Sequence, residues 1–480
     1  MNRLSQLSTR ADAGSGLVLV IVCAGVVLAS LDLFIVNVAL PDIARDLHRT
    51  NLADLTWILN AYAIVYAALL VLFGRLAESR RRDQAFLLGV VVFTAASAAC
   101  GLAGSLTMLV AFRVIQAAGA ALLTPTSLSL VLATTEPSRR HSAVRAWTAV
   151  GGLAAALGPV IGGVLVAASW RWVFLVNVPI GLAAVIAGWW RLPPVPGHPG
   201  RRPDPLAAGL VTGGVAALTL GLVKGHEWGW GSTSTLAALA TALLALGLFA
   251  VHCARAENPL ISAGLFRVRT FTGASLVAIL FSIAFGAMLL SIVLWDQDVW
   301  HWSALTTGLA VAPGPLMVPL FSFLVAGRAI ARFGPGRVIA AGATIYAGGA
   351  TWWALAAGTT PNYAGEMLGG MLLTGVGVGL TLPTFMASGA ASLPPEAFAT
   401  GSAVVNMLRQ VGLAIGVAVL VAVLGTPASP AAARTAFAHG WYVVAGASVL
   451  AALAGLLLLP PARAWRVIGT PHADAARSPS

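Results

Sequence analysis

Charged side chains are scarce in this chain. Only 9% of its 480 residues are Asp, Glu, Lys or Arg, whereas 58% are hydrophobic. A soluble domain carries about 25% charged residues, so the composition excludes a separate soluble domain. It predicts an all-α polytopic membrane protein embedded in the lipid bilayer.

Lysine is nearly absent, since Lys224 is the only lysine among 28 basic residues. A Walker A loop needs Lys followed by Ser or Thr, but Gly225 follows Lys224. Direct ATP hydrolysis is therefore not expected, and an ion gradient is the natural energy source. No enzymatic activity is expected either. The net charge of +12 does not indicate nucleic acid, because the basic residues lie in short loops between apolar runs.

Cysteine is also rare: Cys23, Cys100 and Cys253 all lie in apolar runs. Their spacing fits neither a disulfide nor a metal site, and no cofactor is predicted. The first apolar run is too long for a cleavable signal and contains Asp32, so it is predicted to remain as a helix. Little lysine with abundant Ala, Gly and Arg suggests a GC-rich genome, which fits a protein of the bacterial plasma membrane.

Fourteen apolar runs are long enough to cross a bilayer as helices, which takes about 20 residues. They span residues 16–40, 54–74, 84–104, 106–130, 143–168, 171–191, 205–224, 234–254, 271–294, 305–326, 338–358, 362–388, 402–424 and 441–460. An even number of crossings places both ends of the chain on one side of the membrane.

The arginines predict which side that is. With a cytoplasmic N-terminus, 21 basic residues fall in cytoplasmic segments, 5 fall in outer segments, and Arg113 and Arg409 lie within the membrane. Since Lys and Arg concentrate in cytoplasmic loops, both termini are predicted to be cytoplasmic. Eight tryptophans fall near predicted outer helix ends, as an interfacial belt requires. They are Trp57, Trp170, Trp172, Trp228, Trp230, Trp300, Trp302 and Trp441.

Two loops resemble each other, namely Gly74–Arg82 after the second helix and Gly327–Arg337 after the tenth. If helices seven and eight are an insertion, these loops take equivalent places in two six-helix halves. Such halves favour alternating access about a central site. The predicted parts are a cytoplasmic tail (1–15), an N-terminal half (16–191), a connector with two inserted helices (192–270), a C-terminal half (271–460) and a cytoplasmic tail (461–480).

A stripe of small residues organises the fifth predicted helix. Gly151, Ala155, Gly158 and Gly162 recur at spacings of four, three and four, which places them on one helix face. A face without side chains lets a neighbouring helix approach closely, and Pro159 should bend the helix there. The stripe is read either as ordinary small-residue packing or as a pivot between two halves of a transporter.

Two opposite charges lie inside predicted helices at matching depth. Asp32 and Arg113 both fall about 10–12 Å below the predicted outer surface, at 1.5 Å per helical residue. A lone charge at the bilayer centre costs about 2.5–3.5 kcal/mol, so we expect the pair to face one water-filled cavity. Asp32 would then change its protonation state, and Arg113 would tune it. Asp296 and Asp298, near an outer helix end, are expected to be solvated.

Five segments resemble the motifs of one family, the fourteen-helix drug:proton antiporters of the major facilitator superfamily. These segments are Leu31–Pro41, Arg113–Pro125, Gly158–Gly163, Ser169–Gly181 and Asn406–Gly412. Together and in this order they are highly specific for the superfamily. The resemblance implies the major facilitator fold, with two six-helix halves and two inserted helices.

The resemblance also implies roles for particular residues. They are proton coupling for Asp32 and Arg113; a gating loop with Gly74, Glu78 and Arg82; an antiporter hinge with Gly158, Pro159, Gly162 and Gly163; and a possible substrate cavity with Asn37, Gln116, Trp147, Glu366, Asn406 and Arg409. The gating loop departs from the family pattern, which prefers Asp where Glu78 stands and Gly where Arg81 stands.

The resulting hypothesis is a monomeric secondary transporter that exports hydrophobic or cationic organic compounds, such as drugs or natural products, in exchange for protons. One alternative is a proton-coupled importer of a small metabolite on the same fold. Another is a non-transporting membrane sensor, although neither tail is large enough for a signalling domain. A channel is disfavoured because no ring of charges or filter-like segment is present.

Overall fold

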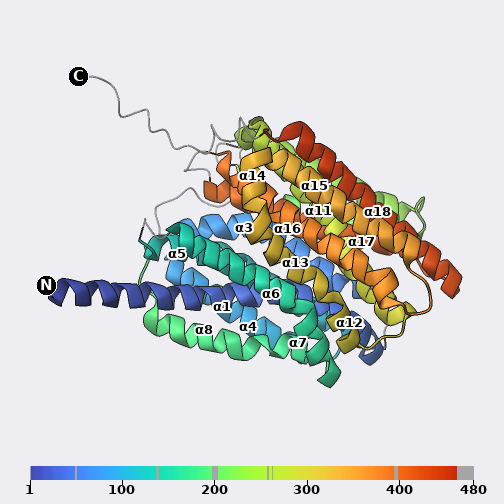
Figure 1. Ribbon diagram of the computed structural model, residues 1–480, viewed down its shortest axis with the longest axis horizontal. Helices are drawn as coiled ribbons and strands as arrows, with labels where there is room; N and C mark the ends of the chain where they lie inside the picture. The colour runs from blue at the N-terminus through green and yellow to red at the C-terminus, as the bar shows by residue number, and fades with distance from the viewer. Residues whose placement is uncertain are drawn as a thin grey trace.

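The computed structural model describes residues 2–48, 51–79, 81–136, 140–196, 204–256, 259–261, 263–393 and 398–461, and this part of the chain is built of helices without strands (Figure 1). Thirteen helices in it are long and apolar enough to cross a membrane. A further helix of 29 residues, α6, covers the remaining predicted range, 143–168. The prediction of an all-α polytopic membrane protein is confirmed.

The N-terminal part of the chain contains eight helices. They are α1 (Asn2–Asp46), α2 (Leu52–Leu55), α3 (Trp57–Ser79), α4 (Arg82–Gly101), α5 (Leu106–Thr134), α6 (Arg140–Ala168), α7 (Trp172–Leu175) and α8 (Asn177–Arg191). α1 continues past Pro41 to Asp46, and α6 runs unbroken through Pro159. The long helices among them pack chiefly on one another: α1 packs against α6, and both α3 and α4 pack against α5. We call them the N-terminal bundle.

Two helices follow as a hairpin, α9 (Pro205–Trp228) and α10 (Thr233–Arg255). α9 packs against α3 of the N-terminal bundle and against α17 (Phe398–Leu424) of the C-terminal part. At one end of α9, Lys224 Nζ forms an ion pair with Asp54 of α2 at 2.6 Å. The hairpin therefore lies beside the seam between the two parts of the molecule, as inserted helices would.

The C-terminal part begins with the short η2 (Ala263–Arg267) and contains broken as well as continuous helices. They are α11 (Arg269–Leu294), η3 (Trp295–Val299), α12 (Ala304–Val311), α13 (Pro313–Phe321), η4 (Ser322–Ala326), α14 (Gly327–Phe333), α15 (Pro335–Ala356), η5 (Tyr363–Met367), α16 (Leu368–Ala391), α17 and α18 (Pro430–Leu458). α11 packs on α17 and α18, and α15 packs on α16 and α18. We call this the C-terminal bundle.

Serine side chains mark where several helices begin. The hydroxyls of Ser105, Ser232, Ser303 and Ser429 each accept a hydrogen bond from a backbone N–H three residues further on, at the starts of α5, α10, α12 and α18. Such caps satisfy amide groups that a helix start leaves unpaired. The local sequence thus fixes these four helix starts.

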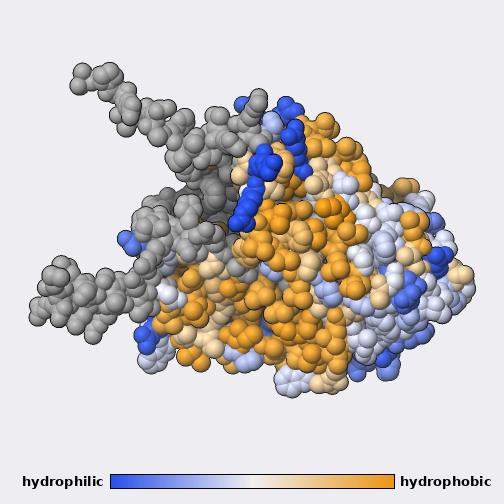
Figure 2. Space-filling view, in the orientation of Figure 1, coloured by the Kyte–Doolittle hydropathy of each residue, from blue (hydrophilic) through white to orange (hydrophobic). Residues whose placement is uncertain are grey.

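The molecule presents an apolar surface along its length. Figure 2 shows a broad hydrophobic band on one face, with hydrophilic residues toward its ends, as a lipid-embedded bundle requires. α1 begins and α18 ends at the same end of the bundle (Figure 1), which an even number of crossings demands. We refer to that end as the inner end and to the opposite end as the outer end, following the arginine distribution.

The structure corrects two predictions about the outer helix ends. The last helix begins at Pro430 rather than at residue 441, because Ser429 caps it there. Trp441 is consequently inside the bundle and 1% exposed, while Trp170 and Trp300 are 4% exposed. These three tryptophans pack within the protein instead of forming an interfacial belt, since their rings meet other aromatic rings such as Phe174 and Trp295.

Candidate functional site

The two charges predicted within the membrane form a buried ion pair. Arg113 Nη1 of α5 lies 2.5 Å from Asp32 Oδ2 of α1. The Arg113 side chain is 1% exposed and that of Asp32 is 0% exposed. Each charge offsets the cost of burying the other, and the pair joins two helices that are 81 residues apart in sequence.

Three polar side chains from other positions complete the surroundings of Asp32. Gln116 donates to Asp32 Oδ1 at 2.9 Å and accepts from Arg113 Nη1 at 2.8 Å. Ser97 of α4 accepts hydrogen bonds from both Gln116 and Asn177, each at 3.0 Å. Asn177 of α8 also approaches Asp32 Oδ1 at 3.5 Å. Four helices thus contribute to one buried polar network around a single carboxylate.

Arg113 is held from two further directions. Its Nε donates to the carbonyl oxygen of Ile58 at 3.1 Å. Its guanidinium lies 4.1 Å from the centre of the Tyr62 ring, an arrangement that favours a cation. A guanidinium can direct several donors at once, and here those donors reach α1, α3 and α5. Arginine at this position therefore fixes three helices around the acid.

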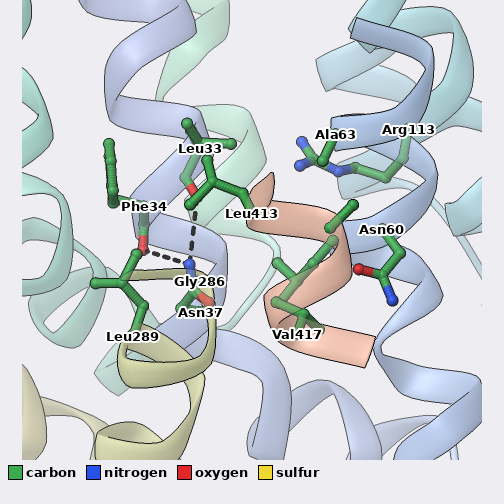
Figure 3. Close-up of a pocket in the computed structure, with 12 residues that line it drawn as sticks. Leu33, Phe34, Asn37, Asn60, Ala63, Arg113, Gly286, Leu289, Leu413 and Val417 are labelled. Carbon is green, nitrogen blue, oxygen red and sulfur yellow. Dashed lines mark hydrogen bonds between the residues drawn. The ribbon is translucent and has the colours of Figure 1, made fainter. Parts of the chain in front are cut away.

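Arg113 also borders a cavity between the two bundles. Figure 3 shows Arg113 and Asn60 on one side and Asn37 beside Gly286 of α11 on the other, with Val417 of α17 between them. The full lining consists of Leu33, Phe34, Asn37, Leu59, Asn60, Ala63, Arg113, Gly286, Leu289, Leu413, Ala414 and Val417. The cavity measures about 30 Å³, which leaves room for about one or two water molecules.

The geometry refines the prediction that Asp32 and Arg113 share a wet cavity. Arg113 lines the cavity, whereas Asp32 lies behind it, within the polar network. Arg113 consequently stands between the carboxylate and the cavity. A change in the charge of Asp32 would be felt in the cavity through this guanidinium.

Among the six predicted cavity residues, Asn37 alone lies in the described lining. Its amide donates to the carbonyl oxygens of Leu33 and Phe34, at 3.2 and 3.4 Å (Figure 3). The other five make different contacts. Gln116 belongs to the Asp32 network, Trp147 donates to Ser127, Glu366 accepts from the Gly358 backbone, and Arg409 donates to Asn406.

Sequence reasoning missed Asn60 as a cavity residue. Asn60 of α3 is 0% exposed, and both of its amide atoms lack a hydrogen-bond partner among the described residues. A buried amide without partners is uncommon and costly, so Asn60 stands out among the residues that line the cavity. The signal was present in the sequence, since Asn60 interrupts the apolar run of 54–74.

The glycine stripe of α6 faces its own bundle. An added Cβ at Gly151, Gly158 or Gly162 would lie within 3.0 Å of a side chain of α1. α6 contacts the C-terminal bundle through the neighbouring face of the helix. There Gly163 approaches the Ala304 carbonyl, and Gly308 of α12 approaches the Pro159 carbonyl. The predicted hinge motif thus packs on α1 with one face and on the C-terminal bundle with the other.

The predicted gating loop is described only in part. Gly74 and Glu78 fall in the last turns of α3, and their surroundings lie outside the described part of the structure. The Arg82 backbone N–H, at the start of α4, donates to the Val195 carbonyl at 3.0 Å. Asp83 accepts hydrogen bonds from the Val195 N–H and from Arg81. This loop is therefore tied to the segment that follows α8.

Asp296 contradicts the expectation of a solvated acid. It is 1% exposed, whereas Asp298, two residues later, is exposed as expected. Asp296 lies in η3, a π-helical turn that continues α11. The wider turn is a feature that the sequence did not reveal.

Comparison with known proteins agrees with this architecture. The family model described as Major Facilitator Superfamily matches residues 22–417. The chain belongs to the Major Facilitator Superfamily. The match begins within α1, includes the hairpin and ends within α17, so it leaves out α18 but includes the Asp32 network and the cavity lining.

Relatives within this superfamily include several antibiotic resistance and export proteins. A tetracenomycin C resistance and export protein of Streptomyces glaucescens is 34% identical, over 84% of this chain and 74% of that protein. A methylenomycin A resistance protein of Streptomyces coelicolor is 32% identical, over 97% and 95%. A cephamycin export protein of Amycolatopsis lactamdurans is 35% identical, over 96% and 95%.

Solved structures confirm the fold. An auto-inhibited peptide transporter of the POT family superposes with a TM-score of 0.65 at 19% sequence identity, over 96% of this chain and 99% of that chain. At this identity the similarity concerns the fold alone. Superfamily membership and the apolar helices identify a multi-pass membrane protein, which in a bacterium lies in the plasma membrane.

Proposed function

We propose that this chain exports hydrophobic organic compounds, antibiotics or natural products among them, in exchange for protons. The observation that carries the proposal is the position of Arg113, which borders the cavity while it neutralises Asp32. One residue thereby links the space for substrate to an acid that can bind a proton. The names of the relatives, which are resistance and export proteins, support the direction of transport.

Proton binding to Asp32 would act through electrostatics. In the structure the carboxylate balances the guanidinium of Arg113 at 2.5 Å. A proton on Asp32 removes that negative charge, so Arg113 becomes an uncompensated cation beside the cavity. Its positive charge then attracts water or an acceptor group and favours separation of the bundles. Loss of the proton restores the ion pair.

The cavity lining favours hydrophobic over cationic substrates. Most of the described lining side chains are aliphatic or aromatic, and the polar ones are Asn37, Asn60 and Arg113. No carboxylate is among them, and Arg113 is itself a cation. A lipophilic compound with carbonyl or hydroxyl acceptors can bond to the amides and the guanidinium, whereas a cation would meet like charge.

Transport in reconstituted vesicles tests the proposed function. A pH gradient imposed across the membrane is expected to drive uphill movement of a lipophilic antibiotic, and Asp32→Asn is expected to abolish the uphill component while passive exchange continues. Counterflow in oriented vesicles separates export from import. Transport that is indifferent both to the gradient and to Asp32→Asn would contradict the proton role.

A further inference from the structure

A second arginine lies within the membrane, on the inner side of the cavity. Arg409 of α17 comes one turn before Leu413, which lines the cavity (Figure 3). Tyr66 of α3 comes one turn after Ala63, which lines it too. The Tyr66 phenol and Arg409 interact electrostatically across the seam between the bundles. These two side chains therefore lie just inward of the cavity, one from each bundle.

The hydrogen bonds of Arg409 use only one side of its guanidinium. Nε donates to Asn406 Oδ1, one turn earlier on α17, at 3.0 Å. Within the described part of the chain, neither Nη atom forms a hydrogen bond or an ion pair, and the side chain is half-buried. A guanidinium presents its N–H groups as a planar fork that matches the two oxygens of a carboxylate. In Arg409 the outer end of that fork remains available.

The helices around Arg409 bring no acid to it. α17 packs on α3, α9, α11, α16 and α18, and it shares with the last three the absence of Asp and Glu. The acid of α3, Glu78, comes twelve residues after Tyr66, which is about 18 Å along the helix. The acid of α9, Glu227, pairs with Lys224 near the outer end. Tyr66 is thus the one ionisable group of the described residues that acts on Arg409.

A cation removed from water gains most from a hydrogen-bonded anion, because a charged pair of this kind offsets the lost hydration. We propose that Arg409 binds the carboxylate of transported compounds, so that the chain prefers lipophilic organic acids to neutral compounds of the same shape. The carboxylate would accept hydrogen bonds from the two Nη atoms. The apolar body of the compound would lie against the aliphatic lining of the cavity, including Leu413 and Val417.

The depth of Arg409 favours the carboxylate of a transported compound over the phosphate of a lipid. Arg409 comes eleven residues after Phe398, where α17 begins at the inner end, and eleven residues correspond to about 16 Å. A lipid phosphate stays at the membrane surface, outside the hydrocarbon core. A carboxylate on an apolar body can instead enter between the bundles and reach this depth.

Entry requires the bundles to separate at the inner end. The cavity of about 30 Å³ has room for little more than water in this structure. Separation of α3 from α17 would part Tyr66 from Arg409 and turn the free end of the fork toward the enlarged space. The negative charge of a compound would then be recognised at Arg409, whereas Arg113 is already balanced by Asp32.

This inference rests on the proposed function, since it names the class of substrate for the same cavity. Equilibrium binding tests it without a proton gradient. Titration calorimetry on the full chain in detergent uses 4-biphenylacetate as the probe and 4-biphenylacetamide as its neutral counterpart, with protein-free micelles as the blank. At neutral pH the wild type should bind the carboxylate at least about tenfold more tightly than the amide, because charge-assisted hydrogen bonds are roughly twice as strong as neutral ones.

The variants decide whether Arg409 is responsible. Arg409→Gln should bind the two compounds within about twofold of each other, since it lacks the charge. Arg409→Lys keeps the charge without the fork, so its preference should fall to about threefold, and it serves if the Gln variant does not fold. Arg269→Gln is the matched control. Arg269 is an exposed arginine at the inner end that donates to the Leu457 carbonyl, and its replacement should leave the preference unchanged.

Several results would overturn the inference: no binding of the carboxylate, equal binding of both compounds by the wild type, an undiminished preference in Arg409→Gln or Arg409→Lys, or an equal loss in Arg269→Gln. Failure of the proposed function looks different. A wild-type preference for the carboxylate without export driven by a pH gradient would count against proton exchange alone. Gradient-driven export with equal binding of acid and amide would count against the role of Arg409 alone.

Discussion

At the scale of single residues, the site contrasts two buried polar groups. Arg113 has many partners and is needed to balance Asp32, whereas Asn60 has none among the described residues. A group with every bond satisfied contributes to a rigid structure. An amide without a partner among the described residues contributes no such bond. The two therefore differ in what their replacement should do.

Replacement of Arg113 by Gln is expected to destabilise the protein strongly. Removal of one member of a buried ion pair costs about 3–5 kcal/mol, because the other charge stays buried without a partner. The double variant Asp32→Asn, Arg113→Gln removes both charges and should regain most of that stability, yet transport should no longer respond to a pH gradient. Thermal unfolding in detergent and vesicle transport measure the two effects, and a double variant as unstable as the single one would contradict the ion-pair account.

Asn60→Leu is expected to leave stability unchanged within about 1 kcal/mol or to raise it, because no hydrogen bond is lost. The preference among substrates should shift toward compounds with fewer carbonyl and hydroxyl groups. Asn177→Leu is the matched control, since Asn177 is equally buried but bonded to Ser97, and it should cost about 1–3 kcal/mol. Unfolding curves and competition between two antibiotics provide the readouts. Equal destabilisation by both changes would argue against a free amide at Asn60.

At the scale of secondary-structure elements, the crossing of α6 and α12 holds the bundles together at the outer end. Backbone approaches backbone there, because Gly163 and Gly308 lack side chains. Close helix approach of this kind is a major source of association in membranes, where lipid tails remove the hydrophobic driving force. The same crossing would have to part for the outer end to open.

Gly308→Ala is expected to favour separation at this crossing. Its Cβ would lie 2.5 Å from the Pro159 carbonyl oxygen, and backbone cannot yield as a flexible side chain can. The distance between the two bundles at the outer end, measured between spin labels on Gly104→Cys and Ala428→Cys, should lengthen, and transport should fall by about tenfold. A tenfold change is equivalent to roughly 1.4 kcal/mol in the equilibrium between joined and separated bundles. Gly213→Ala on α9 is the control, because no atom lies within 4 Å of its added Cβ. A closed distance distribution in Gly308→Ala would show that the crossing tolerates a methyl group.

At the scale of the whole molecule, two bundles face each other across the cavity and the α9–α10 hairpin covers one side of the seam. The hairpin contacts α3 and α17, one helix from each bundle. Only 11% of the residues in an 18-residue apolar stretch of α10 are buried inside the protein, so this helix chiefly faces lipid. The division into halves at residues 192–270 stays a prediction that agrees with this arrangement.

The orientation of the molecule in the membrane is open to a direct test. The excess of arginine in the loops of the inner end predicts that both termini lie in the cytoplasm. Epitope tags at either end should be inaccessible to antibody in intact cells and accessible after permeabilisation. A tag in the loop before α18, near Ala428, should be accessible in both conditions. Labelling of either terminal tag in intact cells would reverse the assignment.

Much of the fold followed from the sequence because bilayer thickness imposes a length on every apolar run. Even so, the run of 305–326 is divided into α12, α13 and η4, with Pro313 and Pro319 among its residues. Trp441 was misplaced because the last helix begins at Pro430, well before the apolar run that was used to predict its start. The site was predictable where charge is costly, as at Asp32 and Arg113, and less so for neutral groups such as Asn60.

The sequence by itself determined that the chain crosses a membrane many times, that it resembles drug:proton antiporters, and that one acid and one arginine lie at equal depth within it. These properties depend on residue type and on distance along a helix, both of which can be read locally. The tertiary structure alone decided that Arg113 stands between Asp32 and the cavity, that the glycine stripe faces α1, and that Asp296 is buried. Those facts depend on which helix faces lie together, and segments far apart in the sequence meet only after the bundles have packed.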